Sequence, residues 1–360
     1  DAQGEHTYQV QVVVTLDQDI IAPGALECPE PGSGESGGLA NGADLTHNGQ
    51  IQEDEDCATL PLIDITKGVS EGPTGNDDGT WTAIYDIVVR NSGGAEGNYD
   101  LTDRLDADGD MEVIGAELIT SPEGVDVNDG WTGQGESGAA ENVIATGVGL
   151  GAGAEHTYQV EVVLGIGDVE DGVPIITDCA AMPGGDQGGL FNTAEITHND
   201  IVDEDLACLT IGLVVVDKSI ADGPEANGDG TWTITYDVLA ENVGGAAAEY
   251  DISDRLRYGE GIDVVSADVI TVPEGVEALD SWTGLGEDGA VENLIATEVL
   301  IDVGQVHQYQ VRAVVELDGD MVTPGDLQCP PPGSGENGGL AKSAMIDSNG
   351  SGSEDEACAS

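Results

Sequence analysis

An internal repeat of about 150 residues constrains this chain more than any other feature of its sequence. The string HTYQV, which begins at His6, returns at His156 and again, as HQYQV, at His307. The segment GESGAAENVIAT at Gly135 recurs as GEDGAVENLIAT at Gly286. The chain is therefore built from one structural unit that occurs more than once.

Within the repeat, alternating apolar residues predict β-strands. Side chains at every second position share one face of a strand, so a half-buried strand shows a period of two. Asn and Gly clusters such as 91–94 separate these stretches, and we find no convincing helical period. Many short strands with turn signals predict an all-β fold made of β-sandwiches. The two clearest alternating rows are Trp81, Ala83, Tyr85, Ile87 and Val89, and Trp232, Ile234, Tyr236, Val238 and Ala240.

The repeats divide the chain into three parts. Residues 59–208 and 209–360 are complete repeats, whereas 1–58 match only the C-terminal part of a β-sandwich repeat. Half a sandwich cannot cover its own apolar face. We therefore expect the missing part upstream in the same polypeptide, with strands donated by a neighbouring subunit as the alternative.

The second and third repeats also carry a recognisable order of motifs. Tyr85 to Asn91 is followed by Gly93 and by Tyr99-Asp100-Leu101-Thr102-Asp103-Arg104-Leu105, and Trp131-Thr132-Gly133 comes later. This order resembles the immunoglobulin-like conserved-repeat domains of prokaryotic cell-surface proteins. The resemblance covers essentially the whole chain, although these repeats are longer than usual. It implies tandem immunoglobulin-like β-sandwich repeats, a cell-surface or secreted location and no catalytic residues.

The cysteines predict one disulfide in each repeat. The spacing between the two cysteines of a pair is the same in all three repeats, and only pairing within a repeat gives every repeat the same bond. No CxxC motif or nearby histidine cluster favours zinc. Disulfides place the chain outside the cytosol. The predicted pairs are Cys28–Cys57, Cys179–Cys208 and Cys329–Cys358.

The charge of the chain limits its partners. With 71 acidic and 8 basic side chains, the formal net charge is -63. Such a surface repels nucleic acids and anionic membranes. The sequence has no apolar run long enough to span a membrane, so we expect no direct membrane insertion of this segment. The remaining expected partners are identical chains or further repeats of the same polypeptide.

Acidic clusters raise the question of calcium. We expect no cofactor, but calcium is an alternative because it needs six to eight oxygen ligands around one point. Clusters of acidic residues precede the second cysteine of each pair, and one further run has the oxygen spacing of a calcium loop. A solvated, charged strand is the competing interpretation. The candidate ligands are Asp54, Asp56, Asp203, Asp205, Asp106, Asp108 and Asp110.

Two lysines occupy equivalent positions in the first strand of their repeats, Lys67 and Lys218. In some immunoglobulin-like domains of surface proteins, a first-strand lysine forms an amide with a late-strand asparagine, assisted by a buried acid. Asn192 lies in a suitable strand, but Lys342 aligns with it in the third repeat, which counts against a general mechanism. The alternative is an edge lysine that discourages strand pairing.

These observations favour a mechanical function and no enzymatic activity. We expect a structural component of an extracellular filament, sheath or adhesin stalk, forming a stiff acidic rod of disulfide-linked repeats. A calcium-dependent extracellular adhesion or binding module is the alternative. The five histidines occupy only two positions of the repeat and do not suggest a catalytic site.

Overall fold

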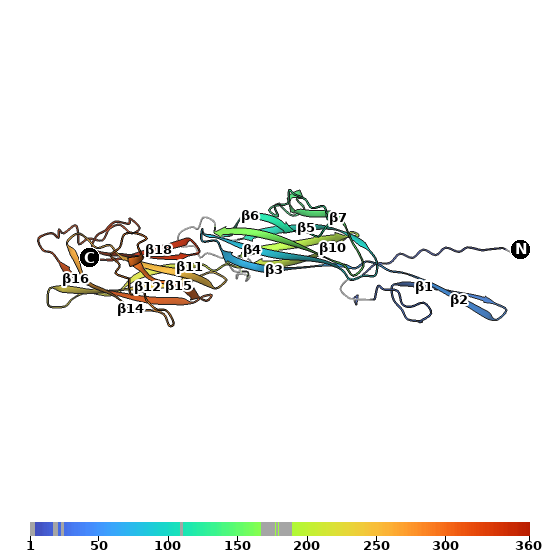
Figure 1. Cartoon of the computed structure of the whole chain (residues 1–360), viewed down its shortest axis with the longest axis horizontal. Coiled ribbons are helices and arrows are strands. Elements are labelled where there is room, and N and C mark those ends of the chain that lie inside the picture. The colour runs from blue at the N-terminus through green and yellow to red at the C-terminus, as the bar shows by residue number, and fades with distance from the viewer. Residues whose placement is uncertain are drawn as a thin grey trace.

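The computed structural model describes residues 4–16, 21–22, 25–108, 111–166, 177, 179 and 189–360. Its strands form a hairpin and two β-sandwiches that follow one another along the long axis (Figure 1). We refer to residues 1–58, 59–208 and 209–360 as the first, second and third repeats. In the described part of the chain, no helix is long and apolar enough to cross a membrane.

The first repeat contributes an exposed hairpin of β1 (Leu39–His47) and β2 (Gln50–Ala58). The alternating residues Tyr8, Val10, Val12 and Val14 also predict a strand in the sequence, but this prediction is wrong for this structure. Tyr8 is 86% exposed, whereas its counterpart Tyr158 in the second repeat is 0% exposed. Tyr158 lies on a strand with hydrogen-bonded neighbours on both sides. Residues 4–16 pair with no strand in the described part of the chain, and alternation alone does not satisfy the backbone of a strand.

The second repeat is a sandwich of two four-stranded antiparallel sheets. One sheet has the order β3-β4-β8-β6 and the other has the order β10-β9-β5-β7. Their strands are β3 (Ile63–Gly75), β4 (Thr80–Asn91), β5 (Gly97–Asp108), β6 (Met111–Thr120), β7 (Val143–Leu150), β8 (Glu155–Ile166), β9 (Gly189–His198) and β10 (Ile201–Leu209).

The third repeat has the same architecture, with sheets β11-β12-β16-β14 and β15-β13-β17-β18. The prediction of an all-β chain of tandem immunoglobulin-like sandwiches is confirmed. Short 3-10 helices at Ala140–Asn142 and Val291–Asn293 precede β7 and β15. The strands are β11 (Val214–Ala226), β12 (Thr231–Asn242), β13 (Ala248–Leu256), β14 (Ile262–Thr271), β15 (Leu294–Ile301), β16 (Val306–Leu317), β17 (Leu340–Ser348) and β18 (Ser351–Ala359).

The core of each sandwich is formed by the alternating rows that the sequence predicts. On β4, every second side chain from Trp81 to Val89 is buried, and Tyr85 packs at the centre with no exposed surface. The row on β12 is buried in the same way from Ile234 to Ala240, while Trp232 stays partly exposed. Burial of this apolar face against the opposite sheet supplies the main stabilisation of each repeat.

The connection between the second and third repeats is short and buried. Leu209 and Ile211 belong to the apolar core of the second repeat, and Val214 belongs to that of the third. Ile211 is completely buried. Only two residues, Gly212 and Leu213, therefore separate one core from the next.

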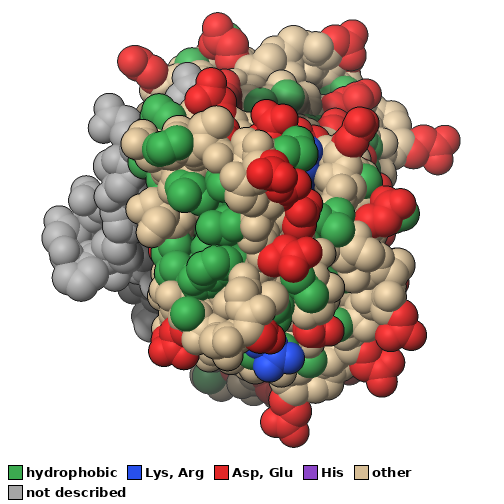
Figure 2. All heavy atoms as spheres, turned by 90° about the vertical axis from the view of Figure 1, so that its left-hand side faces the viewer, with side chains coloured by type: hydrophobic (Ala, Val, Ile, Leu, Met, Phe, Trp, Pro, Cys, Tyr) green, Lys and Arg blue, Asp and Glu red, His purple; other side chains and the backbone are tan. Residues whose placement is uncertain are grey.

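The surface carries the negative charge. Figure 2 shows acidic side chains spread over the end of the molecule formed by the third repeat, with almost no basic side chains in view. Among the described residues, lysine side chains at 67, 218 and 342 are instead buried in the sandwiches. The lysines are thus placed in the interior, whereas arginines such as Arg104 and Arg312 stay partly exposed.

A pair of leucine variants tests where the core lies. Leu101 on β5 is completely buried, whereas Leu206 on β10 is 55% exposed. We expect Leu101→Ala to destabilise the second repeat by about 2–5 kcal/mol, because it leaves a cavity. Leu206→Ala should cost less than about 0.5 kcal/mol. Hydrogen exchange with mass spectrometry measures each repeat separately, and equal losses of protection in the two variants would contradict this core.

Candidate functional site

A buried ion pair connects the two sheets of the second repeat. Lys67 lies on β3 in one sheet and Asp103 lies on β5 in the other. The Lys67 Nζ atom donates a hydrogen bond of 2.6 Å to Asp103 Oδ1. Neither side chain has any exposed surface. The interpretation of Lys67 as an edge residue that discourages strand pairing is therefore wrong, because its amine points into the sandwich.

Asn192 lies next to this pair on β9. In the antiparallel register of β5 and β9, Asp103 faces Ala194 and Leu105 faces Asn192. Asp103 and Asn192 are thus diagonal neighbours on one face of the sheet, which is within reach of side-chain contact. Asn192 is completely buried. Its two amide atoms have no hydrogen-bond partner among the described residues, although buried amides are almost always paired.

The surroundings of the cluster are apolar and aromatic. The Lys67 amine lies 5.3 Å from the centre of the Tyr85 ring. The indole of Trp131 donates a hydrogen bond of 3.0 Å to the backbone carbonyl of Asp103. These two aromatic residues keep water away from the ion pair and fix the strand that carries the carboxylate.

Burial shifts both ionisable groups toward their neutral forms. It lowers the pKa of Lys67, and the charge of Asp103 only partly opposes this effect. It raises the pKa of Asp103, while the charge of Lys67 and its hydrogen bond act in the opposite direction. Transfer of the proton from Lys67 to Asp103 is therefore easier here than in water. The result would be a neutral amine beside a protonated acid and a primary amide.

This arrangement has the components of an amide-forming reaction. A neutral lysine amine is a nucleophile, and the carboxamide carbon of Asn192 is an electrophile. A protonated Asp103 can donate a hydrogen bond to the amide and later transfer its proton. The cross-link that the sequence suggested for Lys67 and Asn192 thus has its buried acid in Asp103.

The third repeat has the same buried lysine and aspartate, but a second lysine replaces the asparagine. Lys218 donates a hydrogen bond of 2.7 Å to Asp254 Oδ2, and Lys342 Nζ lies 3.1 Å from Asp254 Oδ1. All three side chains are fully buried. Lys342 stands where Asn192 stands in the second repeat, so this site contains two amines and no carboxamide. One aspartate cannot neutralise two ammonium groups.

Burial accordingly lowers the pKa of Lys342 to about 7, although Asp254 opposes the shift; the charge of Lys218 lowers it further. The amine also lies over two rings, 4.9 Å from the centre of Tyr236 and 5.3 Å from that of Trp282. Near neutral pH the site thus holds one ion pair and an amine that is close to losing its proton.

Asp103 and Asp254 are the members that sequence reasoning did not single out. A signal was present, because each is flanked by apolar residues at alternate positions, Leu101 and Leu105 around Asp103. An acidic residue on the inward face of a strand needs a buried partner. That partner is the inward-facing lysine of the first strand, which is Lys67 for Asp103 and Lys218 for Asp254.

Two of the predicted calcium ligands have a structural role. Asp203 Oδ2 accepts a hydrogen bond of 3.2 Å from the backbone of Ile65, and Asp205 Oδ2 accepts one of 2.7 Å from the backbone of Lys67. The third repeat repeats this contact between Asp355 and the backbone of Lys218, at 2.7 Å. These carboxylates connect the edge strands of the two sheets.

The other predicted ligands are not brought together. Asp54 and Asp56 lie on the exposed strand β2, and Asp106 pairs with Arg104 at 2.8 Å. Asp108 ends β5, and Asp110 lies outside the described residues. Within the described ranges there is no group of three or more His, Cys, Asp or Glu side chains able to hold a metal ion. Calcium binding stays a prediction.

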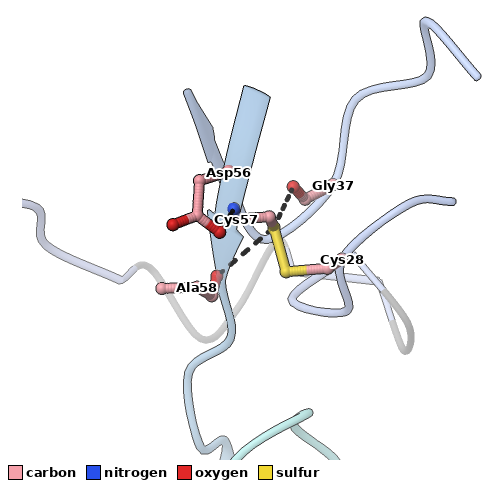
Figure 3. Close-up of a disulfide and its surroundings, with 5 residues drawn as sticks. All are labelled: Cys28, Gly37, Asp56, Cys57 and Ala58. Atoms are coloured by element: carbon pink, nitrogen blue, oxygen red, sulfur yellow. Dashed lines mark hydrogen bonds between the residues drawn. A yellow bond between two sulfur atoms is a disulfide. The ribbon is translucent and has the colours of Figure 1, made fainter. Parts of the chain in front are cut away.

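Each repeat contains one disulfide, at Cys28–Cys57, Cys179–Cys208 and Cys329–Cys358. Figure 3 shows the first, in which Cys57 Sγ lies 3.7 Å from the carbonyl oxygens of Gly37 and Ala58. Gly38 packs directly on this bond with a φ of 52°, so a side chain there would meet the sulfur atoms. The bond attaches the loop before the last hairpin to its final strand.

Comparisons with known proteins give only distant similarity. No family profile and no curated protein matches the chain. A solved structure titled BspA_C_WT is 12% identical, with a TM-score of 0.34, and the match covers 82% of this chain and 100% of that one. The full-length major pilin SpaD from Corynebacterium diphtheriae is 10% identical, with a TM-score of 0.27 and coverages of 79% and 56%.

A tetra-tandem repeat in the extending region of a large adhesion protein is 11% identical, with a TM-score of 0.23 and coverages of 88% and 55%. The chain thus spans about half the length of the pilin and adhesion chains that it matches. At these TM-scores the similarities carry no functional argument, and the function must be inferred from the buried cluster.

The pH dependence of the third repeat tests the charge of Lys342. The amine keeps a pKa of 10.5 when unfolded and about 7 when folded. Between these values the unfolded state binds one proton more, so stability rises with pH. Lys342→Met removes the titrating amine, so the stability of the variant lacks this dependence on pH. We expect the variant to be more stable than the wild type at pH 7. This difference in the free energy of unfolding should shrink by about 1.4 kcal/mol per pH unit above pH 7.

Pulse proteolysis in urea between pH 7 and 9 measures this difference, with the repeats distinguished by fragment mass. Groups present in both proteins cancel in the comparison. A difference that stays constant over this pH range would show that Lys342 remains protonated in the fold.

Proposed function

We propose that this chain is a segment of an extracellular structural protein, a stalk, sheath or filament, whose repeats carry tension. In the second repeat an amide bond between Lys67 and Asn192 joins the two sheets. The observation that carries this proposal is the buried cluster in which Lys67 and Asp103 meet across the sandwich beside Asn192, with the amide of Asn192 unpaired.

The proposed bond forms by a balanced exchange. Lys67 Nζ attacks the Cγ carbon of Asn192, a carbon–nitrogen bond forms to the lysine, and the bond to the amide nitrogen of Asn192 breaks. Asp103 receives the proton of the lysine and delivers it to the leaving nitrogen, which departs as ammonia. No oxidant, metal or additional reactant is required, and the surrounding aromatic side chains exclude the water that would compete.

The position of the bond suits a protein under tension. Force along the chain enters the second repeat at β3 and leaves at β10, which belong to different sheets. Lys67 is on the first of these strands, and Asn192 is on β9, which pairs with the last. A covalent bond there, together with the disulfide Cys179–Cys208, would prevent the strands between them from being pulled out.

The mass of the intact chain tests the bond directly. Under denaturing conditions the wild type should be lighter than its sequence by one ammonia, and a digest should contain a branched peptide that joins Lys67 to Asn192. Lys67→Arg removes the nucleophile and Asp103→Ala removes the acid, so both variants should keep the full mass. A wild-type chain with the full mass would contradict the proposal.

Single-molecule stretching tests the function. Without the bond, unfolding of the second repeat should release roughly 110 residues between Lys67 and the disulfide, or about 400 Å at full extension. This step should be present in Lys67→Arg and absent in the wild type. The third repeat, which lacks the asparagine, extends in both proteins and serves as the internal control.

Exchanging Asn192 and Lys342 between the two repeats provides a stricter test. Lys342→Asn gives the third repeat the set Lys218, Asp254 and asparagine, so this variant should lose a second ammonia. Asn192→Lys should abolish the loss in the second repeat. If Lys342→Asn retained both amine and amide while the wild-type second repeat lost ammonia, the three side chains alone would not suffice.

A further inference from the structure

The third repeat contacts the second through the tip of its last hairpin. Asn349 lies at this tip, between β17 and β18, with a φ of 56°. Its backbone carbonyl accepts a hydrogen bond of 2.7 Å from Gly79, and its side-chain Oδ1 accepts one of 2.8 Å from the backbone of Asp77. Its Nδ2 donates one of 2.7 Å to the carbonyl of Thr80. Asn349 thus makes three hydrogen bonds to the turn between β3 and β4.

This turn, residues 75–80, is held in shape by its own hydrogen bonds. The backbone of Asn76 donates to the carbonyl of Thr80 at 3.0 Å, and the Thr80 hydroxyl donates to Asp78 at 2.6 Å. The corresponding turn of the third repeat, 226–231, has the same two bonds at 3.0 and 2.7 Å. No hairpin tip among the described residues forms hydrogen bonds with that turn, so the shape does not depend on the contact.

Two glycines permit the close approach of the repeats. A Cβ atom on Gly75 would collide with the side-chain amide of Asn349, and a Cβ atom on Gly350 would collide with the backbone of Asp77. The Asp77 backbone cannot move aside, because it belongs to the rigid turn. The contact therefore requires the absence of a side chain at one position on each repeat.

The equivalent positions show that this requirement is not met everywhere in the chain. Ala226 stands in the third repeat where Gly75 stands in the second, and Asp200 stands in the second-repeat hairpin where Gly350 stands in the third. Only the first-repeat hairpin, with Asn48 and Gly49, has the same Asn-Gly tip. Each repeat thus carries a hairpin tip and a turn, but they do not all fit one another.

A second contact fixes the same pair of repeats elsewhere. Thr177, which precedes Cys179, is buried. Its hydroxyl donates to the carbonyl of Ile211 at 3.1 Å and accepts a bond of 3.1 Å from the backbone of Gly245 in the third repeat. These two separate contacts, together with the two-residue link, restrict rotation of one repeat against the other.

We propose that the hairpin tip 348–350 and the turn 75–80 form a selective joint that sets the angle between neighbouring repeats. An Asn-Gly tip fits a turn that begins with glycine, and an added methyl or carboxylate group at either position prevents it. The partner of the tip Asn48-Gly49 is then another repeat of this type, with a glycine at the position of Gly75. The joint is independent of the amide bond inside the second repeat.

The experiment measures the distance distribution between the repeats in the full chain. Spin labels are attached through unnatural amino acids at the exposed positions Glu123 and Glu274, and pulsed electron paramagnetic resonance gives the distribution. We expect one narrow distribution for the wild type. Gly75→Ala should lose the narrow peak, since the methyl group displaces Asn349. Gly68→Ala is the matched control, because it lies on the same strand in open space.

Neither Gly75 nor Gly68 has a positive φ, so alanine imposes no backbone strain at either position. Asn349→Asp replaces the donor of the bond to Thr80 with a carboxylate oxygen, which repels the Thr80 carbonyl, and should broaden the distribution without affecting folding. Gly350→Asp reproduces the second-repeat tip and should do the same. The proposal is overturned if Gly75→Ala and Asn349→Asp keep the wild-type distribution, or if Gly68→Ala broadens it equally. Intact mass reports the amide bond in the same samples, so the two proposals fail separately.

Discussion

The burial of a lysine and an aspartate between two sheets is the constraint to which the rest of each sandwich is adapted. A buried ion pair contributes little net stability, but removal of one partner leaves an uncompensated charge and costs about 3–5 kcal/mol. The inward faces must therefore bring Lys67 and Asp103 together within a shell of aromatic rings. Tyr85, Trp131 and the Asp205 contact to the Lys67 backbone all serve this geometry.

The two complete repeats use one framework for different chemistry. Where the second repeat has Asn192, with an amide that no described residue satisfies, the third has Lys342, with an amine that Asp254 must share with Lys218. The reaction that we propose would relieve the first arrangement by consuming the amide, whereas loss of a proton from Lys342 relieves the second. A single difference at one strand position thus separates a proposed covalent closure from a titratable site.

The sequence predicted those features that depend on local pattern or on repetition. Alternation located the buried rows on β4 and β12, and equal cysteine spacing located the disulfides. The prediction failed for residues whose structural role depends on a partner that is far away in the sequence. Residues 4–16 alternate as in a strand but pair with no described strand. Lys67 looks like an edge lysine in the sequence, because only the structure shows that Asp103 is its buried partner. Asp205 likewise finds its partner 138 positions away, so its acidic run suggested a metal site instead.

The buried link between the second and third repeats also affects how the array loses its structure. Because Leu209 and Ile211 lie in one core and Val214 begins the next, neither sandwich can open without exposing apolar surface of the connection. The free energy of unfolding of each repeat then includes a contribution from its interface with the neighbouring repeat, as in a one-dimensional chain of coupled units. Melting should spread from the ends of such an array, and a terminal repeat should be its least protected member.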